Sequence, residues 1–368
     1  MRILHVLPSY DLGGLGSLAL ELIRAWDQSD DCAVIAPRYP ATVPALKSEF
    51  EALDIKALEI ERPRDHMAYV AHLQWAIRTI GDFDGAIIYN VFDHVWTTMA
   101  LKRAGVRPPK RILAHVGTIL PDAEHPRAMF KSPYTQGVTF IPASAAVHNR
   151  LVALGVRPEA LGPIIWNGVD LDNFWPRKPK AAEAASISIG FIGRMAPEAK
   201  DFPTLIKAMG LLNAEAKSKC KLLLVGDGPL QPEYFKLGQQ MAPGQVEFLG
   251  PMKPAQVRRF LSDLDFFVMA ALPIEGMSMA LVEAIAAGLP IIATDVPGNR
   301  EVVDEHGLLT KPGDPVDMAR AIEGLVLDED RRAYFAELSA ARRREFSIEI
   351  TARHYRELLQ EGQDALRI

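Results

Sequence analysis

Cysteine, long apolar runs and a bias of charge are scarce or missing in this sequence. Its 368 residues hold two cysteines, Cys32 and Cys220, which excludes a disulfide scaffold and a cysteine-based zinc site. We therefore expect a reducing, cytoplasmic setting. No run of about 18 apolar residues occurs, so we expect no membrane-spanning helix, and the short apolar N-terminus is not typical of a signal peptide. Peripheral contact with the inner face of a membrane stays open.

The charge balance limits the class of partner. The chain carries 41 Lys and Arg against 46 Asp and Glu, a formal net charge of −5, whereas a general nucleic-acid binder needs a large basic surface. We therefore expect no nucleic-acid partner, although a local basic pocket could still hold a phosphate. The chain also lacks a P-loop, an H-E-x-x-H motif and a G-x-S-x-G nucleophile elbow. Its histidines show no metal-ligand spacing, so no metal site is indicated.

What the sequence does contain is an alternation of short β-rich runs and amphipathic stretches. In the first half the predicted strands are Arg2–Leu7, Cys32–Ala36, Ala86–Asn90, Arg111–His115 and Thr139–Pro142. The predicted helices between them are Ser17–Trp26, Met67–Ile80, Val95–Ala104 and Ala145–Leu154. Apolar strands that alternate with amphipathic helices predict an α/β fold, with a parallel sheet covered on both faces.

The alternation stops at Asp172–Ser186, a proline- and lysine-rich stretch that predicts a linker, and then restarts. The predicted strands of the second half are Ile187–Ile192, Lys221–Val225, Val246–Leu249, Phe266–Met269 and Pro290–Thr294. Its predicted helices include Thr204–Ala214, Met279–Ala287 and Val316–Leu327. We therefore expect two Rossmann-like domains, residues 1–171 and residues 172–346. A last amphipathic stretch, Ile348–Glu361, has no strand after it.

In open α/β sheets the ligand binds outside the carboxyl ends of the strands, so we expect function in the loops that follow the strands, facing a cleft between the domains. After the first strand, Gly13 and Gly14 open a helix, where backbone amides favour a phosphate or a sugar. Gly14, Gly16 and Ala19 also match the dinucleotide fingerprint G-x-G-x-x-A. However, Pro8–Leu12 separate this match from the strand, and no acid ends the second strand, which disfavours NAD.

Charged side chains occupy the loops of the second half. Arg194 and Lys200 follow the strand Ile187–Ile192 on a glycine-containing loop, where both could hold one diphosphate. Glu275 follows the strand Phe266–Met269. Each of these residues, taken alone, is also compatible with an ordinary solvated loop.

A helix is predicted to start near Ser278, a suitable N-cap, with Glu283 inside it. The amides of Gly276, Met277 and Ser278 would then lie at a helix N-terminus, where an anion is favoured. Eight residues of ideal helix would span roughly 12 Å between Glu275 and Glu283. A retaining glycosidase needs its carboxyl groups about 5 to 5.5 Å apart, so this pair is not typical of one.

Two further strand ends are candidates. His115 ends the strand Arg111–His115, where an imidazole could bind a sugar hydroxyl or transfer a proton; a structural role stays open. Gly226-Asp227-Gly228-Pro229 follows the strand Lys221–Val225 and is typical of a tight turn.

In their order along the chain, these stretches resemble glycosyltransferase family 4, the retaining, nucleotide-sugar-dependent enzymes of GT-B fold. The motifs that carry the resemblance are Gly13-Gly14, Asn167-Gly168-Val169-Asp170, Gly193-Arg194 with Lys200, Gly226-Asp227-Gly228-Pro229, Phe248-Leu249-Gly250, Glu275 with Glu283, Gly288-Leu289-Pro290, Gly298, Glu301 and Pro312-Gly313-Asp314. They span nearly the whole chain.

The resemblance implies an acceptor domain at 1–171, a donor domain at 172–346, and a final helix at about 347–368 that returns to the first domain. It implies a hexosyltransferase that moves a sugar from a UDP-, GDP- or ADP-sugar to a hydroxyl, usually without a metal or other cofactor. The acceptor would be a glycan, a glycolipid or a small molecule, as in bacterial-type polysaccharide, glycolipid or glycoconjugate synthesis.

The resemblance also implies roles for individual residues. Arg194 and Lys200 would hold the donor diphosphate, Glu283 the ribose hydroxyls and Glu275 the sugar, with His115 near the sugar. The remaining donor-binding positions would be Gly13, Gly14, Gly226, Leu249, Met252, Gly276, Met277 and Ser278.

The first domain departs most from the family pattern. Val116 stands where an acid often follows the histidine, Ile87–Asn90 lacks the usual His-x-His, and Asp201 replaces a glycine after Lys200. Three alternatives therefore stay open: a GT-B nucleotide-sugar epimerase, a non-catalytic nucleotide-sugar-binding subunit, and an NAD-binding oxidoreductase.

Overall fold

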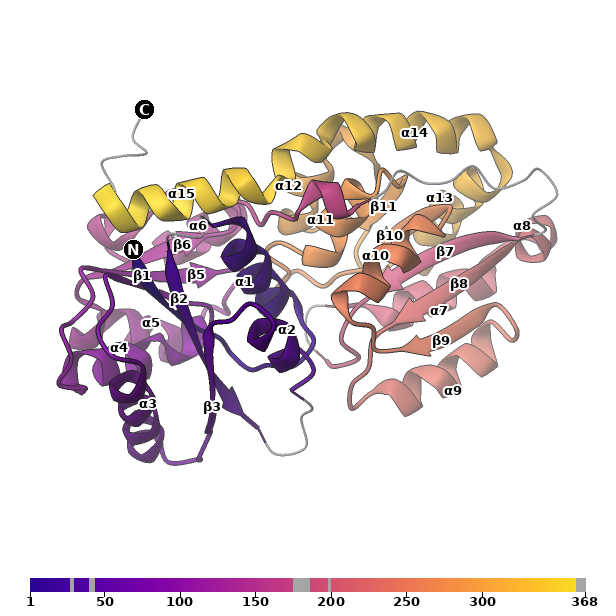
Figure 1. The fold of residues 1–368 in the computed structure, drawn as a ribbon. Helices are drawn as coiled ribbons and strands as arrows, with labels where there is room; N and C mark the ends of the chain where they lie inside the picture. Colours follow the sequence, from indigo (N-terminus) through magenta and orange to yellow (C-terminus); the bar gives the residue numbers. More distant parts are fainter. Residues whose placement is uncertain (27–29, 40–43, 175–185, 198–199, 362–368) are drawn as a thin grey trace. The chain divides into compact units, whose positions relative to one another are not determined.

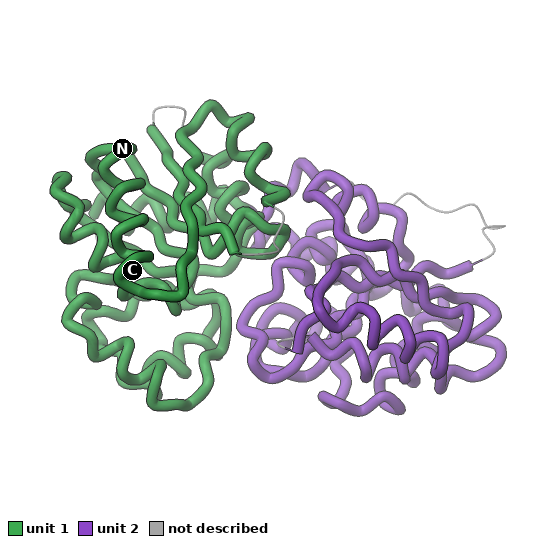
Figure 2. Tube along the Cα trace, turned by 90° about the horizontal axis from the view of Figure 1, so that it is seen from below, with its two compact units in different colours: residues 1–168, 348–368 green, residues 169–347 purple. Residues whose placement is uncertain are grey.

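The computed structural model describes residues 1–26, 30–39, 44–174, 186–197 and 200–361. The chain forms two compact units, shown in green and purple in Figure 2. Unit 1 comprises Met1–Gly168 together with Ile348–Ile368, and unit 2 comprises Val169–Ser347. Most of the predicted linker Asp172–Ser186 lies outside the described residues.

In the described part of unit 1, six strands pair in parallel in the order β3-β2-β1-β4-β5-β6. They are β1 (Arg2–Val6), β2 (Asp31–Arg38), β3 (Lys56–Glu61), β4 (Gly85–Ile88), β5 (Arg111–Val116) and β6 (Val138–Pro142). The strand order reverses between β1 and β4, which is where an open α/β sheet opens a crevice at its carboxyl edge.

Helices cover both faces of this sheet. They are α1 (Gly14–Ala25), α2 (Lys47–Glu51), α3 (His66–Ile80), α4 (His94–Arg103), α5 (Glu124–Lys131), α6 (Ala145–Ala153) and α15 (Ile348–Glu361). The connection from β1 to β2 runs toward one edge of the sheet, and the connection from β4 to β5 runs toward the other edge. Because both crossovers are right-handed, α1 and α4 lie on opposite faces of the sheet. Accordingly, α3 packs beside α4, whereas α15 packs beside α1 (Figure 1).

Polar side chains set several helix ends. The Asp65 carboxylate accepts a hydrogen bond from the Ala68 amide at 2.7 Å and caps α3, which ends at Gly81 with φ at +104°. Short 3-10 turns connect other elements: η1 (Val91–Asp93), η2 (Pro133–Thr135), η3 (Pro158–Ala160), η4 (Leu171–Asn173), η5 (Asp304–His306) and η6 (Arg343–Phe346).

The described part of unit 2 repeats this plan, with six parallel strands in the order β12-β11-β10-β7-β8-β9. They are β7 (Ile187–Ile192), β8 (Cys220–Val225), β9 (Val246–Gly250), β10 (Phe266–Met269), β11 (Ile291–Thr294) and β12 (Leu308–Thr310). Its helices are α7 (Phe202–Leu211), α8 (Ala214–Lys219), α9 (Gln231–Met241), α10 (Pro254–Ser262), α11 (Met279–Ala286), α12 (Pro297–Val303), α13 (Pro315–Leu327) and α14 (Glu329–Arg342). Here the strand order reverses between β7 and β10, which pair directly.

The central strands are buried on both faces, as their apolar sequences predict. All four residues of β4, β10 and β11 are buried. The two strands that the sequence did not predict, β3 and β12, lie at the outer edges of their sheets. Both are only partly buried, so their sequences lack the continuous apolar run on which the other predictions rest.

Candidate functional site

The two loops that carry the predicted cations and carboxylate of unit 2 leave neighbouring strands. Because β7 and β10 pair, the loop after β7 runs beside the loop after β10. Lys200 forms an isolated antiparallel bridge with Ala271, and the Asp201 amide donates to the Ala270 carbonyl oxygen at 3.0 Å. Asp201 in turn caps α7 by accepting from the Thr204 amide at 3.1 Å, which gives this departure from the family pattern a local role.

Lys200 and Glu275 form a nearly buried ion pair. Lys200 Nζ lies 2.7 Å from Glu275 Oε2, and the side chains are 13% and 11% exposed. The ammonium also donates to Ser278 Oγ at 2.9 Å and contacts Met269 Sδ at 3.2 Å. Low exposure strengthens such a charge-assisted contact, because little water competes for it.

Gly298, at the start of α12, brings that helix against the Glu275 loop. A Cβ at position 298 would lie 2.2 Å from the Gly276 carbonyl oxygen and 2.5 Å from that of Glu275. The Glu275 amide also donates to the Leu272 carbonyl oxygen at 3.0 Å. The absence of a side chain at position 298 therefore helps to set the place of the Glu275 backbone.

Helix α11 begins at the predicted place, and Glu283 lies inside it as expected. Ser278 is its N-cap residue, but its side chain makes no capping hydrogen bond and accepts from Lys200 instead. Gly276, Met277 and Ser278 are buried at this N-terminus, and Glu283 is partly buried. The first turn of a helix leaves amides without intrahelical acceptors, so the site combines a cation with a helix terminus that favours an anion.

The Arg194 side chain is exposed, and the backbone on either side of it is hydrogen-bonded to the end of β8 and to the loop that follows β8. The Gly193 amide donates to the Val225 carbonyl oxygen at 3.0 Å, and the Met195 amide donates to that of Asp227 at 2.6 Å. Within the part of the chain that the structure describes, the Arg194 guanidinium is in no hydrogen bond or ion pair, so it is available to an anion.

Gly226 and Gly228 make this loop packing possible. Their φ angles are +127° and +150°, and a Cβ would lie 2.0 Å from the Gly193 carbonyl oxygen or 2.4 Å from that of Met195. The Gly226 amide already donates to the Gly250 carbonyl oxygen at 2.9 Å. Close packing between the two loops therefore explains why glycine stands at positions 226 and 228.

Leu249 and Met252, the positions predicted near the base, flank the end of β9. Leu249 is the penultimate residue of that strand, and Met252 lies in the loop before α10; both are partly buried. Since β9 pairs with β8, which pairs with β7, this loop belongs to the same carboxyl edge as the Arg194 loop.

In unit 1, Gly13 and Gly14 are exposed where α1 begins. Gly13 is the N-cap residue in extended conformation, and no atom lies within 4 Å of a Cβ built on it. The neighbouring Gly16 differs, because a Cβ there would lie 2.6 Å from Leu46 Cδ1. Packing against Leu46 thus accounts for the second glycine of the apparent dinucleotide fingerprint.

His115 lies in β5 and is 1% exposed. Its Nδ1 is 2.9 Å from the Tyr355 hydroxyl of α15, and its Nε2 lies next to Gly117, which follows the strand. Burial lowers the pKa of His115 to about 4, so the imidazole is neutral near pH 7. His115 and the start of α1 come close together, since Leu15 is beside Gly117.

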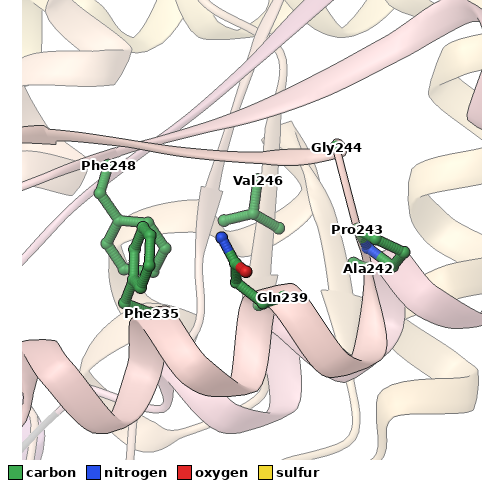
Figure 3. A pocket seen from close by; sticks show the side chains of 8 residues that line it. Phe235, Gln239, Ala242, Pro243, Gly244, Val246 and Phe248 are labelled. Atoms are coloured by element: carbon green, nitrogen blue, oxygen red, sulfur yellow. The ribbon is translucent and has the colours of Figure 1, made fainter.

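A separate hollow lies between α9 and β9 (Figure 3). The Phe235 and Phe248 rings lie side by side there, with centroids 5.6 Å apart. Its volume of about 180 Å³ is below the roughly 300 Å³ at which ordinary ligand pockets begin. None of the predicted site residues lines it.

Sequence reasoning missed three contacts with the site, those of Tyr355, Met269 and Gly298. Tyr355 carried no motif, and its partner is 240 residues away, so no local pattern could have revealed it. Met269 was predicted only as a strand residue. Gly298 belonged to the family pattern, but its contact with the Glu275 backbone required the structure.

None of the helices in the described ranges combines the length and the hydropathy that a membrane span requires. Nor do three or more His, Cys, Asp or Glu side chains gather there in an arrangement that could hold a metal ion.

Residues 186–328, most of unit 2, match the family model described as "Glycosyl transferases group 1". A GDP-mannose-dependent monoacylated alpha-(1-6)-phosphatidylinositol monomannoside mannosyltransferase of Corynebacterium glutamicum is 30% identical over 53% of this chain and 55% of its own length. The putative glycosyltransferase EpsF of Bacillus subtilis is 26% identical over 80% of this chain and 79% of its own length. Apart from EpsF, the chain spans about half the length of the curated relatives that it matches.

Solved structures match over almost the whole chain. Anabaena HepE in complex with UDP-glucose superimposes with a TM-score of 0.81 at 20% identity, over 98% of this chain and 99% of that one. Sucrose-phosphate synthase from Thermosynechococcus elongatus gives 0.75 at 17% identity, over 98% and 99%. The predicted GT-B fold is thereby confirmed, with two parallel Rossmann-like sheets and the last helix packed on α1.

Proposed function

Through residues 186–328 this chain belongs to the glycosyl transferases group 1, and from that premise we propose that it moves a sugar from a nucleotide-sugar donor to an acceptor hydroxyl with retention of configuration. Unit 2 is proposed to bind the donor and unit 1 the acceptor.

The observation that carries this proposal is the arrangement around Lys200. Its ammonium is held at the N-terminus of α11 by Glu275 and Ser278, and the exposed Arg194 extends from the same loop. A cation at a helix N-terminus, with a second cation on the same loop, suits a departing diphosphate, and a carboxylate suits sugar hydroxyls. An ammonium has three N–H donors, so Lys200 can bind a phosphate oxygen while it keeps a protein partner.

In the proposed step, the bond between sugar C1 and the β-phosphate oxygen breaks, and both electrons leave with the nucleoside diphosphate. The acceptor oxygen forms the new bond to C1 on the same face, and its proton passes to the departing phosphate oxygen. Arg194, Lys200 and the start of α11 stabilise the charge that develops on that oxygen. His115 is neutral and is proposed to hydrogen-bond a sugar oxygen. Glu283 is proposed to bind the ribose.

The donor and acceptor are proposed only as classes. A UDP-, GDP- or ADP-sugar fits the cation pair equally, and the relatives differ here, since one is named as GDP-mannose-dependent and another was solved with UDP-glucose. We propose a glycan or glycolipid acceptor, because the mannosyltransferase relative is named for a phosphatidylinositol mannoside. No metal is proposed, so activity should be unchanged in EDTA.

A thermal-shift screen with UDP, GDP, ADP and their sugars tests the donor class. One nucleotide at about 100 times its Kd should stabilise the protein by about 2.7 kcal/mol, which raises the Tm by several degrees. Lys200→Ala should abolish that shift. Gly238→Ala is the control, because position 238 is in α9 with no atom closer than 3.5 Å to its Cβ. If no nucleotide raises the Tm of the wild-type protein, donor binding is refuted.

Product analysis tests the reaction. With the donor found in that screen and a panel of acceptors, we expect nucleotide release together with a glycoside of the donor's anomeric configuration. A changed nucleotide sugar without release would identify an epimerase instead. An inverted anomer would refute retention.

A further inference from the structure

A tyrosine of the last helix contacts the predicted site histidine in the interior of unit 1. The Tyr355 hydroxyl lies 2.9 Å from His115 Nδ1, and each residue is 1% exposed. Because both side chains are buried, this hydrogen bond orients the imidazole ring, and its direction decides which ring nitrogen carries the proton.

The second ring nitrogen points to the carboxyl end of β5. His115 Nε2 lies 3.0 Å from where a Cβ would be at Gly117, a partly buried residue, and Leu15 of the first turn of α1 lies 3.8 Å from the same point. Among the described residues, Nε2 is buried without a hydrogen-bond partner. A buried polar atom without a partner costs free energy, and a ligand oxygen at this strand end would remove that cost.

Helix α15 holds Tyr355 in place through contacts on both sides of it in sequence. Trp26 Nε1 donates to the Ala352 carbonyl oxygen at 3.1 Å, and Thr351 Oγ1 donates to that of Trp166 at 2.9 Å. One turn further, Arg356 forms an ion pair with the buried Asp30 at 3.3 Å. The hydroxyl therefore has a fixed position.

We propose that Tyr355 is a positioning residue for His115: its hydroxyl donates to Nδ1, which places the ring proton on Nε2 and directs that N–H at an oxygen of the donor sugar. This inference rests on the proposed function, which gives His115 its place near the sugar. An imidazole nitrogen is a better acceptor than a phenol oxygen, so the phenol is the donor of the pair. A neutral imidazole carries one proton, and with Nδ1 accepting it must be on Nε2.

The His115 and Tyr355 side chains are both uncharged near pH 7. Burial lowers the pKa of His115 to about 4 and raises that of the Tyr355 hydroxyl. The pair is thus a neutral hydrogen bond that selects a tautomer.

Unit 1 contains a matched control pair. The Tyr89 hydroxyl lies 3.0 Å from His5 Nδ1, and both residues are at most 1% exposed. Tyr89→Phe and Tyr355→Phe each remove one buried hydroxyl from a histidine, but only the Tyr355 hydroxyl is bonded to His115. Tyr89 meets His115 through its ring alone, with centroids 6.1 Å apart, and Tyr89→Phe keeps that ring. A general loss of packing or stability would affect both variants alike.

The experiment combines nitrogen NMR of 15N-histidine-labelled protein with steady-state kinetics. In the wild type, we expect the His115 signals of the Nε2–H tautomer. Tyr355→Phe should shift them toward the other tautomer and lower kcat by roughly 10- to 100-fold, the order expected when a reacting contact is misplaced, with donor Km changed less. Tyr89→Phe should leave the His115 signals and kcat unchanged. His115→Gln, whose amide can donate from a similar position, should retain more activity than His115→Ala.

The outcomes separate this inference from the function on which it rests. An Nδ1–H tautomer in the wild type, unchanged His115 signals in Tyr355→Phe, or an equal kcat loss in Tyr89→Phe would each overturn the positioning role, even with transfer activity intact. Wild-type kcat in His115→Ala would instead remove His115 from the proposed site, and the inference with it.

Discussion

Replacement of Gly298 by alanine is expected to displace Glu275 without removing any charged group of the candidate site. The added Cβ would lie 2.2 Å from the Gly276 carbonyl oxygen, and real Cβ contacts essentially never fall below 3.0 Å. One side must therefore move by about 0.8 Å. The neighbouring Asn299 is fully buried, and its amide donates to the Thr294 carbonyl oxygen at 3.0 Å, which anchors the start of α12. We expect the Glu275–Gly276 peptide to yield.

The size of the effect follows from that displacement. Overpacking of this kind costs about 1–3 kcal/mol of stability, so the Tm should fall by several degrees. A shift near 1 Å in a group that positions a substrate can cost about 100-fold in rate, or about 2.7 kcal/mol of barrier. Because Lys200 is bonded to the Glu275 carboxylate, it should be drawn out of place as well. The two losses are thus of similar size, but the catalytic loss should persist at temperatures where the variant is fully folded.

The assay is sugar transfer, or donor hydrolysis where no acceptor is known, with kcat/KM compared at a temperature where every variant is folded. Gly238→Ala serves as the control, because its nearest neighbour is at an ordinary 3.5 Å. Wild-type kcat/KM in a folded Gly298→Ala protein would refute the reasoning, since it would mean that the Glu275 backbone tolerates the shift or has no part in the reaction.

Three further predictions concern charge. Arg194→Ala should keep the wild-type Tm, because the residue is exposed, but lose about 100- to 1,000-fold in kcat/KM; near-normal turnover would remove Arg194 from the site. Lys200→Ala should lower the free energy of unfolding by about 3 kcal/mol in urea titrations, because it leaves a buried carboxylate unpaired, and adding Glu275→Gln should restore part of it. Unit 1 should lose stability as the pH falls from about 6.5 toward 4, since burial lowers the pKa of His5 to about 3 and those of His94 and His115 to about 4. The unfolded chain then binds more protons, at up to about 1.4 kcal/mol per pH unit for each histidine, and pH-independent unfolding of unit 1 would contradict this.

Periodicity predicted the central strands because burial on both faces demands unbroken apolar runs. It failed at β3, whose sequence Lys56–Glu61 mixes charged and apolar residues at a sheet edge, and at β12, which has three residues. The position of each site loop, directly after a strand, was also predictable from the sequence. The contacts between loops were not predictable, because strand order is a property of the whole sheet. The contact between Lys200 and Glu275, for example, depends on the pairing of β7 with β10.

The glycines of unit 2 show why a motif alone left its physical role open. A glycine after a strand permits either close approach of a ligand or close approach of another backbone. Around Arg194 the second applies, since Gly226 and Gly228 face the carbonyl oxygens of Gly193 and Met195, the residues on either side of the arginine. Two loops joined in this way leave the guanidinium as the part that extends outward. The glycine turn and the arginine, which are separate motifs in the sequence, therefore form one structural unit. In that unit the backbone that carries the Arg194 cation is already positioned before an anion binds.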